Sequence, residues 1–212
     1  MEKQRGIERL IFFTDAVVAI AITLLILPLV DIVTADSSGA HPVSVQHFLQ
    51  NNIGQLLAFG LSFVIIARFW IANHGILADT IGSTTLLIWL DITWVFTIVV
   101  LPLPTEITAV YAASELTTTI YIGTCLAGML LLTAMSVYLY RHPELEQKGK
   151  PTSAVQIWGV GSTAAGFLLA FLLELIVPGL HYWTLLVLFV ATPLDFVVKP
   201  YIRRREAAKT PK

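Results

Sequence analysis

The chain has 212 residues, of which 56% are hydrophobic and only 13% charged, and its mean hydropathy is +0.79. Soluble domains carry about a quarter charged residues, so this composition indicates an integral membrane protein. The net charge of −1 excludes a globally basic nucleic-acid-binding protein, and the single cysteine, Cys125, excludes an intrachain disulfide and a multi-cysteine zinc cluster.

Six apolar segments of the chain are long enough to cross a bilayer. A hydrocarbon core of about 30 Å needs about 20 apolar residues for each helical crossing, and polar or Pro/Gly-containing stretches separate the segments. The predicted spans are residues 10–30, 53–72, 86–104, 120–140, 158–177 and 183–198. We therefore expect an all-α integral membrane protein, in which residues 1–198 form a single six-helix transmembrane domain and residues 199–212 form a basic cytoplasmic tail.

The first two spans carry additional signals. The first follows a charged stretch, as the core of a secretory signal does, but its length and the presence of Asp15 in its first turns favour a retained helix. The second span is expected to start earlier than its apolar run, because Ser44 is a suitable N-cap for a helix that runs through His47 and Phe48 toward Leu56. We expect this extension to stand outside the membrane.

The basic residues predict the orientation of the spans. Cytoplasmic connections of membrane proteins are enriched in Lys and Arg, and with six crossings all 13 Lys and Arg of this chain fall on one side. The connections on the other side contain the acids Asp31, Asp36, Glu106 and Glu115. We therefore expect both termini to be cytoplasmic, with the lipid bilayer as the surroundings and no nucleic acid as a partner.

Five ionisable residues lie inside the predicted spans, where charges are costly and by default suggest function. They are Asp15, Arg68, Asp91, Glu174 and Asp195. Because the first two spans are antiparallel, Asp15 and Arg68 lie at one depth near the cytoplasmic ends of their helices. Two interpretations remain open. Either the arginines extend to the interface and one pairs with Asp15, or a polar network fixes the tilt of the first helix.

The start of the first span carries a motif. It reads Arg9-x-x-x-Phe13-Thr14-Asp15 and is followed by an apolar run that ends at Pro28. This stretch resembles Arg-x-x-x-Phe-Ser-Asp, the signature that opens the first helix of the lysosomal potassium channel family called transmembrane protein 175. Thr14 replaces the serine with another short hydroxyl side chain, which preserves the capacity for hydrogen bonding.

Two later segments support the resemblance. Arg68-x-Trp70-x-x-Asn73-His74 is similar to the family's Trp-x-x-His-His stretch, with asparagine at the first histidine position. Residues 101–105, Leu-Pro-Leu-Pro-Thr, are similar to the family's Leu-Pro-Phe-x-Thr ending of the third span. Beyond the third span the chain is compatible with the family only in its hydropathy.

The resemblance implies a potassium-selective channel in which the first helix of each subunit lines a central pore. Members with one six-helix repeat are prokaryotic and form tetramers, so a homotetramer in a prokaryotic cytoplasmic membrane is implied. The implied pore-facing residues are Ile20, Thr23, Leu24 and Leu27, with Ile20 at the narrowest constriction. The polar network that positions the first helix comprises Arg9, Phe13, Thr14, Asp15, Arg68, Trp70, Asn73 and His74. Potassium is then the permeant ion, held only transiently, with no fixed metal site and no cofactor.

Other functional classes remain open from the residues alone. The implied pore-facing positions share one helical face, but nearly every residue of that helix is apolar, so packing or lipid contact explains the face equally well. The rival class is a proton- or cation-coupled secondary transporter that uses Asp91, Glu174 or Asp195, and a third is a membrane subunit without transport. No metalloprotease, Walker or serine-nucleophile motif is present in the sequence, so we do not expect an enzyme.

Overall fold

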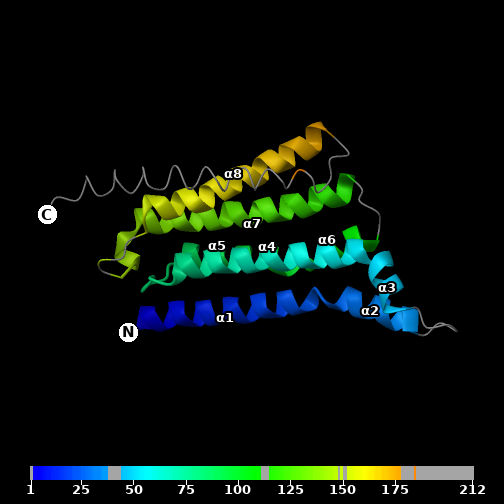
Figure 1. The fold of residues 1–212 in the computed structure, drawn as a ribbon. Helices are drawn as coiled ribbons and strands as arrows, with labels where there is room; N and C mark the ends of the chain where they lie inside the picture. The colour runs from blue at the N-terminus through cyan, green and yellow to red at the C-terminus, as the bar shows by residue number, and fades with distance from the viewer. Residues whose placement is uncertain are drawn as a thin grey trace.

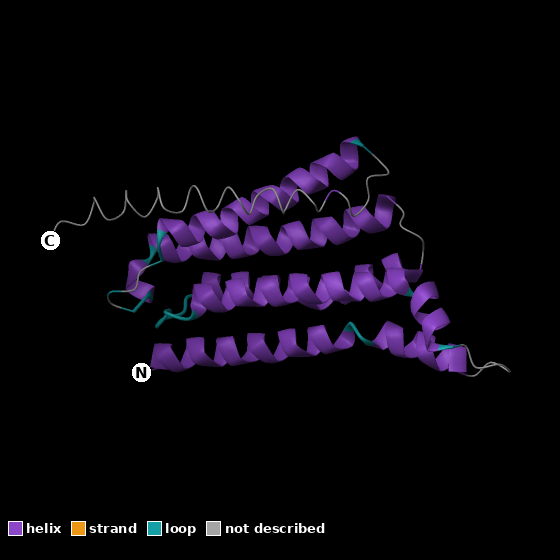
Figure 2. Ribbon diagram, in the orientation of Figure 1, coloured by secondary structure: helices purple, strands orange, loops and turns teal. Residues whose placement is uncertain are grey.

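The computed structural model describes residues 2–37, 44–110, 115–147, 149, 152–177 and 184. Within these ranges the chain folds into helices joined by short connections (Figures 1 and 2). The helices are α1 (Glu2–Leu24), α2 (Leu27–Ser37), α3 (Val45–Asn51), α4 (Ile53–Leu77), α5 (Thr85–Val100), α6 (Pro102–Val110), α7 (Glu115–Arg141) and α8 (Ala154–Ile176), with the 3-10 turn η1 (Pro143–Leu145) before α8. This architecture confirms the predicted all-α fold class.

Five helical stretches of the described chain are long and apolar enough to cross a membrane. They are Arg5–Thr34, Ile53–Leu77, Thr85–Ile107, Glu115–Arg141 and Ala154–Ile176. They coincide with the first five predicted spans, and all five are longer, because a helix continues beyond the apolar run that predicts it. The predicted sixth span, residues 183–198, lies outside the described residues except for Thr184, and so does the basic tail over 199–212.

Two of these stretches are interrupted next to a proline. Pro28 and Pro102 lie in the first turns of α2 and α6. A proline has no N–H for the carbonyl four residues earlier, and its ring collides with that carbonyl, but it is tolerated in the first turn of a helix. The first and third predicted spans therefore each consist of two helices instead of one.

The Ser44 cap begins a short separate helix, α3, instead of the expected extension of the second span toward Leu56. The Ser44 hydroxyl accepts a hydrogen bond from the His47 N–H at 3.3 Å, and α3 begins at the next residue after the cap. The two helices stay separate because Asn52 leaves the helical conformation, with φ −111° and ψ 17°. Its side chain donates a hydrogen bond to the Phe48 carbonyl at 2.9 Å.

The helix α7 lies in the middle of the bundle, with α8 on one side and α4 and α5 on the other (Figure 1). Gly128 of α7 permits close approach, because a Cβ atom there would lie 3.0 Å from the Phe69 ring and 3.1 Å from Thr97 Oγ1. Large side chains such as Trp94 and Leu132 are completely buried around this crossing. Because α7 occupies the middle, α1 and α2 lie along one edge of the bundle (Figure 1).

The end of the bundle at which the N-terminus lies is called the base, and the opposite end the distal end. At the base, two connections hold each other in place through backbone hydrogen bonds. Ile81 and Gly82 donate to the Leu145 carbonyl at 2.8 and 3.2 Å, and Gln147 donates to the Asp79 carbonyl at 2.8 Å. These bonds join the α4–α5 connection to the segment that follows α7.

Candidate functional site

The edge helix α1 has one face against the bundle and one face free. Its buried residues recur every three or four positions, which is the spacing of one helical face. With their continuation in α2 they are Ile7, Leu10, Thr14, Val18, Ala21, Leu25 and Leu29, each 9% exposed or less. This face packs against α4 and α5.

The four residues that the resemblance assigns to the pore lie on the free face. Ile20 is 59% exposed, Leu24 43% and Leu27 52%, and Thr23 is exposed as well. Within the described part of the chain no helix covers them. The exposure shows that these side chains are available to line a path or to contact another molecule, which hydropathy could not show.

Thr23 brings a hydroxyl group to the free face. Its Oγ1 atom donates a hydrogen bond to the Ile20 carbonyl of the same helix at 2.8 Å. The hydrogen is therefore used inside the helix, while the oxygen lone pairs remain acceptors. A threonine in this arrangement offers an oxygen to a passing cation.

The helix ends one residue beyond Thr23. Pro28 cannot donate to the Leu24 carbonyl, so the α-helical pattern stops at Leu24 and resumes at Leu27. The Ile26 N–H contacts the Thr23 carbonyl at 3.4 Å, and the Val30 N–H donates to the Ile26 carbonyl at 3.1 Å. The free face thus crosses a break between its third and fourth predicted pore residues.

The base of α1 is held by two hydrogen-bonded links. In the first, the Trp70 Nε1–H of α4 donates to Asp15 Oδ1 at 2.7 Å. The Trp70 ring in turn lies against the His74 ring, with 5.5 Å between centroids. This link joins polar groups of the first two predicted spans.

The second link is centred on Asp91 of α5. The Thr14 hydroxyl donates to Asp91 Oδ2 at 2.6 Å, and the Asn73 amide donates to Asp91 Oδ1 at 2.8 Å. All three side chains are buried, with exposures of 1%, 2% and 0% for Thr14, Asn73 and Asp91. One carboxyl group therefore joins α1, α4 and α5.

The structure brings only part of the predicted network together. Thr14, Asp15, Trp70 and Asn73 make the hydrogen bonds above, and His74 takes part through its ring contact. Arg9, Phe13 and Arg68 are exposed. Among the described residues neither arginine forms an ion pair with Asp15.

Sequence reasoning left Asp91 out of the network. The residue was recognisable as a carboxyl group inside an apolar span, but its partners lie far away in sequence, with 77 positions between Thr14 and Asp91. A buried carboxyl group needs hydrogen-bond partners. That requirement is the signal that pairs Asp91 with the buried hydroxyl and amide groups of neighbouring spans.

The fold and this site define a multi-pass helical membrane protein whose first helix has a hydrogen-bonded base and a free apolar face. Residues 9–102 match the family described as endosomal/lysosomal potassium channel TMEM175. Over this part, which extends from α1 through α5, the chain is similar to the TMEM175 potassium channels.

Solved structures support the same fold. A crystal structure of a lysosomal potassium-selective channel TMEM175 homolog from Chamaesiphon minutus is 21% identical, with a TM-score of 0.64, over 95% of this chain and 98% of that chain. A variant of the potassium channel MtTMEM175, in complex with a nanobody–MBP fusion protein, is 18% identical, with a TM-score of 0.60, over 95% of this chain and 94% of that chain. No curated protein sequence matches the chain.

Proposed function

We propose that this chain forms a potassium-selective channel that conducts passively, with α1 lining a central pore. The observation that carries the proposal is the free apolar face of α1 above a base that hydrogen bonds hold in place. The match of residues 9–102 to the TMEM175 family and the similar solved channels support the same function.

The pore requires more than one copy of the chain. A single bundle has α1 along one edge, so it encloses no path along that helix (Figure 1). A homotetramer around an axis parallel to α1 brings four free faces together and buries apolar side chains that are otherwise exposed. In this assembly the free face of each copy lies next to the free faces of the other copies.

The four pore residues then have distinct roles. Ile20 forms a hydrophobic constriction, where the loss of water opposes ion passage until the ring widens. Thr23, about one turn further, supplies hydroxyl oxygens that replace part of the hydration shell of K⁺. Leu24 and Leu27 continue the lining, and the exposed Asp31 concentrates cations at its mouth.

The distribution of charge supports a cytoplasmic base. Arg5, Arg9, Arg68 and Arg141 are exposed at the base, whereas Asp31, Glu106 and Glu115 are exposed at the distal end. Basic residues are retained on the cytoplasmic side during insertion. We therefore assign both termini to the cytoplasm of a prokaryotic cell and the protein to its cytoplasmic membrane.

Flux measurements in liposomes test the function. Purified protein in potassium-loaded liposomes is expected to release K⁺ faster than Na⁺ without a proton gradient, and to respond to the electrical driving force. Strict coupling of the flux to protons would instead favour the secondary transporter. The absence of any flux would favour a membrane subunit without transport.

The role of Ile20 can be tested separately. We expect Ile20→Asn to raise the conductance and to lower the preference for K⁺ over Na⁺, because a polar ring retains water in the constriction. Leu168→Asn is the matched control, since Leu168 is also exposed but belongs to α8, which lies on the far side of α7 from α1 (Figure 1). Equal effects of both substitutions on planar-bilayer currents would remove Ile20 from the pore.

A further inference from the structure

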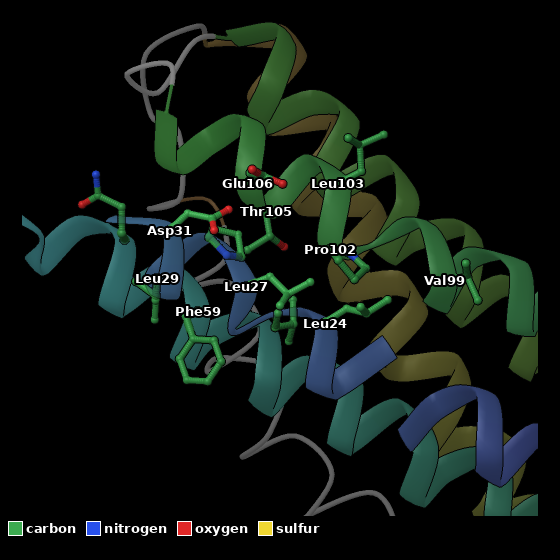
Figure 3. Close-up of a pocket in the computed structure, with 13 residues that line it drawn as sticks. Leu24, Leu27, Leu29, Asp31, Phe59, Val99, Pro102, Leu103, Thr105 and Glu106 are labelled. Atoms are coloured by element: carbon green, nitrogen blue, oxygen red, sulfur yellow. The ribbon is translucent and has the colours of Figure 1, made fainter. Parts of the chain in front are cut away.

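A pocket of about 390 Å³ lies at the distal end, where α1 breaks. Its walls come from the α1–α2 junction, from α4 and from the α5–α6 junction, and they include Leu24, Leu27 and Phe59 (Figure 3). The volume is within the range of small-molecule pockets, about 300–1,000 Å³. Two residues of the proposed pore lining, Leu24 and Leu27, therefore also line this pocket.

The pocket combines apolar walls with negative charge. Asp31 of α2 and Glu106 of α6 lie on the same side of it in Figure 3, next to Thr105. Among the described residues neither carboxyl group has a basic partner, and no lysine or arginine lines the pocket. Leu24 is the last residue of α1, and the C-terminus of a helix adds a partial negative charge.

The wall that carries Glu106 is firmly held. Thr105 donates its hydroxyl hydrogen to the Leu101 carbonyl at 2.8 Å, so its oxygen accepts from Ser62 at 2.9 Å. The Ser62 oxygen in turn accepts from the Tyr121 hydroxyl at 3.1 Å. These buried bonds tie α6 to α4 and α7, whereas the opposite wall contains the helix break at Pro28.

We propose that this pocket binds a hydrophobic organic cation of the tetraalkylammonium type. The charged nitrogen lies between Asp31 and Glu106, and the alkyl groups pack against Phe59, Leu24 and Leu27. An apolar lining selects the alkyl groups, while the two unpaired carboxyl groups select the positive charge. A bound cation holds the break in α1 in one conformation, and the resulting change in conduction rests on the proposed function.

Binding is tested with tetrabutylammonium as the probe, by calorimetric titration of the protein in nanodiscs. We expect saturable binding that becomes about tenfold weaker in D31N/E106Q, since two partly exposed ion pairs are lost. The double variant E8Q/E115Q is the matched control, because it removes the same charge from exposed carboxyl groups outside the pocket. Equal affinity in all three proteins, or no saturable binding, would overturn the proposal.

Two further measurements distinguish the apolar from the charged contribution to binding, and the proposed binding site from the proposed channel function. Tetramethylammonium, which lacks the long alkyl groups, is expected to bind more weakly than tetrabutylammonium, and equal affinities would contradict a role for the apolar walls. Tetrabutylammonium is also expected to change the K⁺ flux of wild-type liposomes more than that of D31N/E106Q liposomes. If the wild type binds the probe but conducts no K⁺, the proposed function fails and the binding site stands.

Discussion

The two ends of the first span are built in opposite ways. At the base, α1 is tied to α4 and α5 by directional hydrogen bonds from Thr14 and Trp70. At the distal end the helix breaks before Pro28 and lines a pocket instead of packing closely. The difference shows how one apolar helix can have a rotation fixed by hydrogen bonds at one end and a break beside a pocket at the other.

The base is held together by buried polar groups, which would lose free energy of stabilisation without their hydrogen-bond partners. Asp91 uses both carboxyl oxygens, and Thr14 and Asn73 each place a donor on one of them. Thr14 lies six positions before Ile20, which on a helix with 100° per residue places the two on different faces. Holding Thr14 against α5 therefore directs Ile20 away from the bundle.

The largest effect is expected from Asp91→Leu. The change leaves the buried Thr14 hydroxyl and Asn73 amide without their acceptor, so the free energy of unfolding should fall by about 2–4 kcal/mol. Asp91→Asn keeps one acceptor and adds a donor, and should cost less than about 1 kcal/mol, in line with weak hydrogen bonds between membrane helices. Thermal unfolding of the two purified variants measures the difference. If Asp91→Leu is as stable as the wild type, the base is not held by this group.

A smaller effect is expected from Trp70→Phe. This variant keeps an aromatic ring but removes the donor to Asp15, so it should cost about 1 kcal/mol and allow α1 to change its tilt. We expect a lower ratio of K⁺ to Na⁺ permeability, measured from reversal potentials. Trp89→Phe is the control, because Trp89 of α5 is 61% exposed. The same change of ratio in both variants would show that the Trp70 bond does not position the pore.

Pro28→Ala is expected to have the smallest effect on stability. It should, however, slow amide hydrogen exchange close to the substituted residue. Alanine restores an N–H that can reach the Leu24 carbonyl and favours a continuous helix. Amide hydrogen exchange over residues 25–30 should become slower, with little change at the base. Pro102→Ala, at the break between α5 and α6, serves as the comparison and should leave exchange over residues 25–30 unchanged. Fast exchange at 25–30 in Pro28→Ala would mean that the proline does not cause the break.

Several features of the fold were predictable because they depend on local sequence. The length of the apolar runs predicts the first five spans, and the short side chain of Ser44 predicts the cap of α3. The two proline breaks were missed, although the residues themselves were visible. A proline can continue a span with a kink or start a second helix, and hydropathy does not distinguish these outcomes.

The site was predictable only in part, because its contacts join residues that are far apart in the chain. The motif from Arg9 to Asp15 indicates that polar groups gather at the base. One of the two open interpretations made an arginine the partner of Asp15, whereas the structure has Trp70 in that place. The pocket at the distal end left no signal in the sequence at all. Its walls come from segments that are far apart in the chain.

The amino-acid sequence by itself determined that this protein is a helical membrane protein with polar groups near the base of its first span, since burial in lipid selects the length and composition of each helix. Only the tertiary structure decided which face of α1 is free, because almost every residue on that helix is apolar and hydropathy is the same all round. The choice depends on Thr14: its hydroxyl group needs a buried acceptor, finds it in Asp91, and thereby leaves Ile20 on the outside.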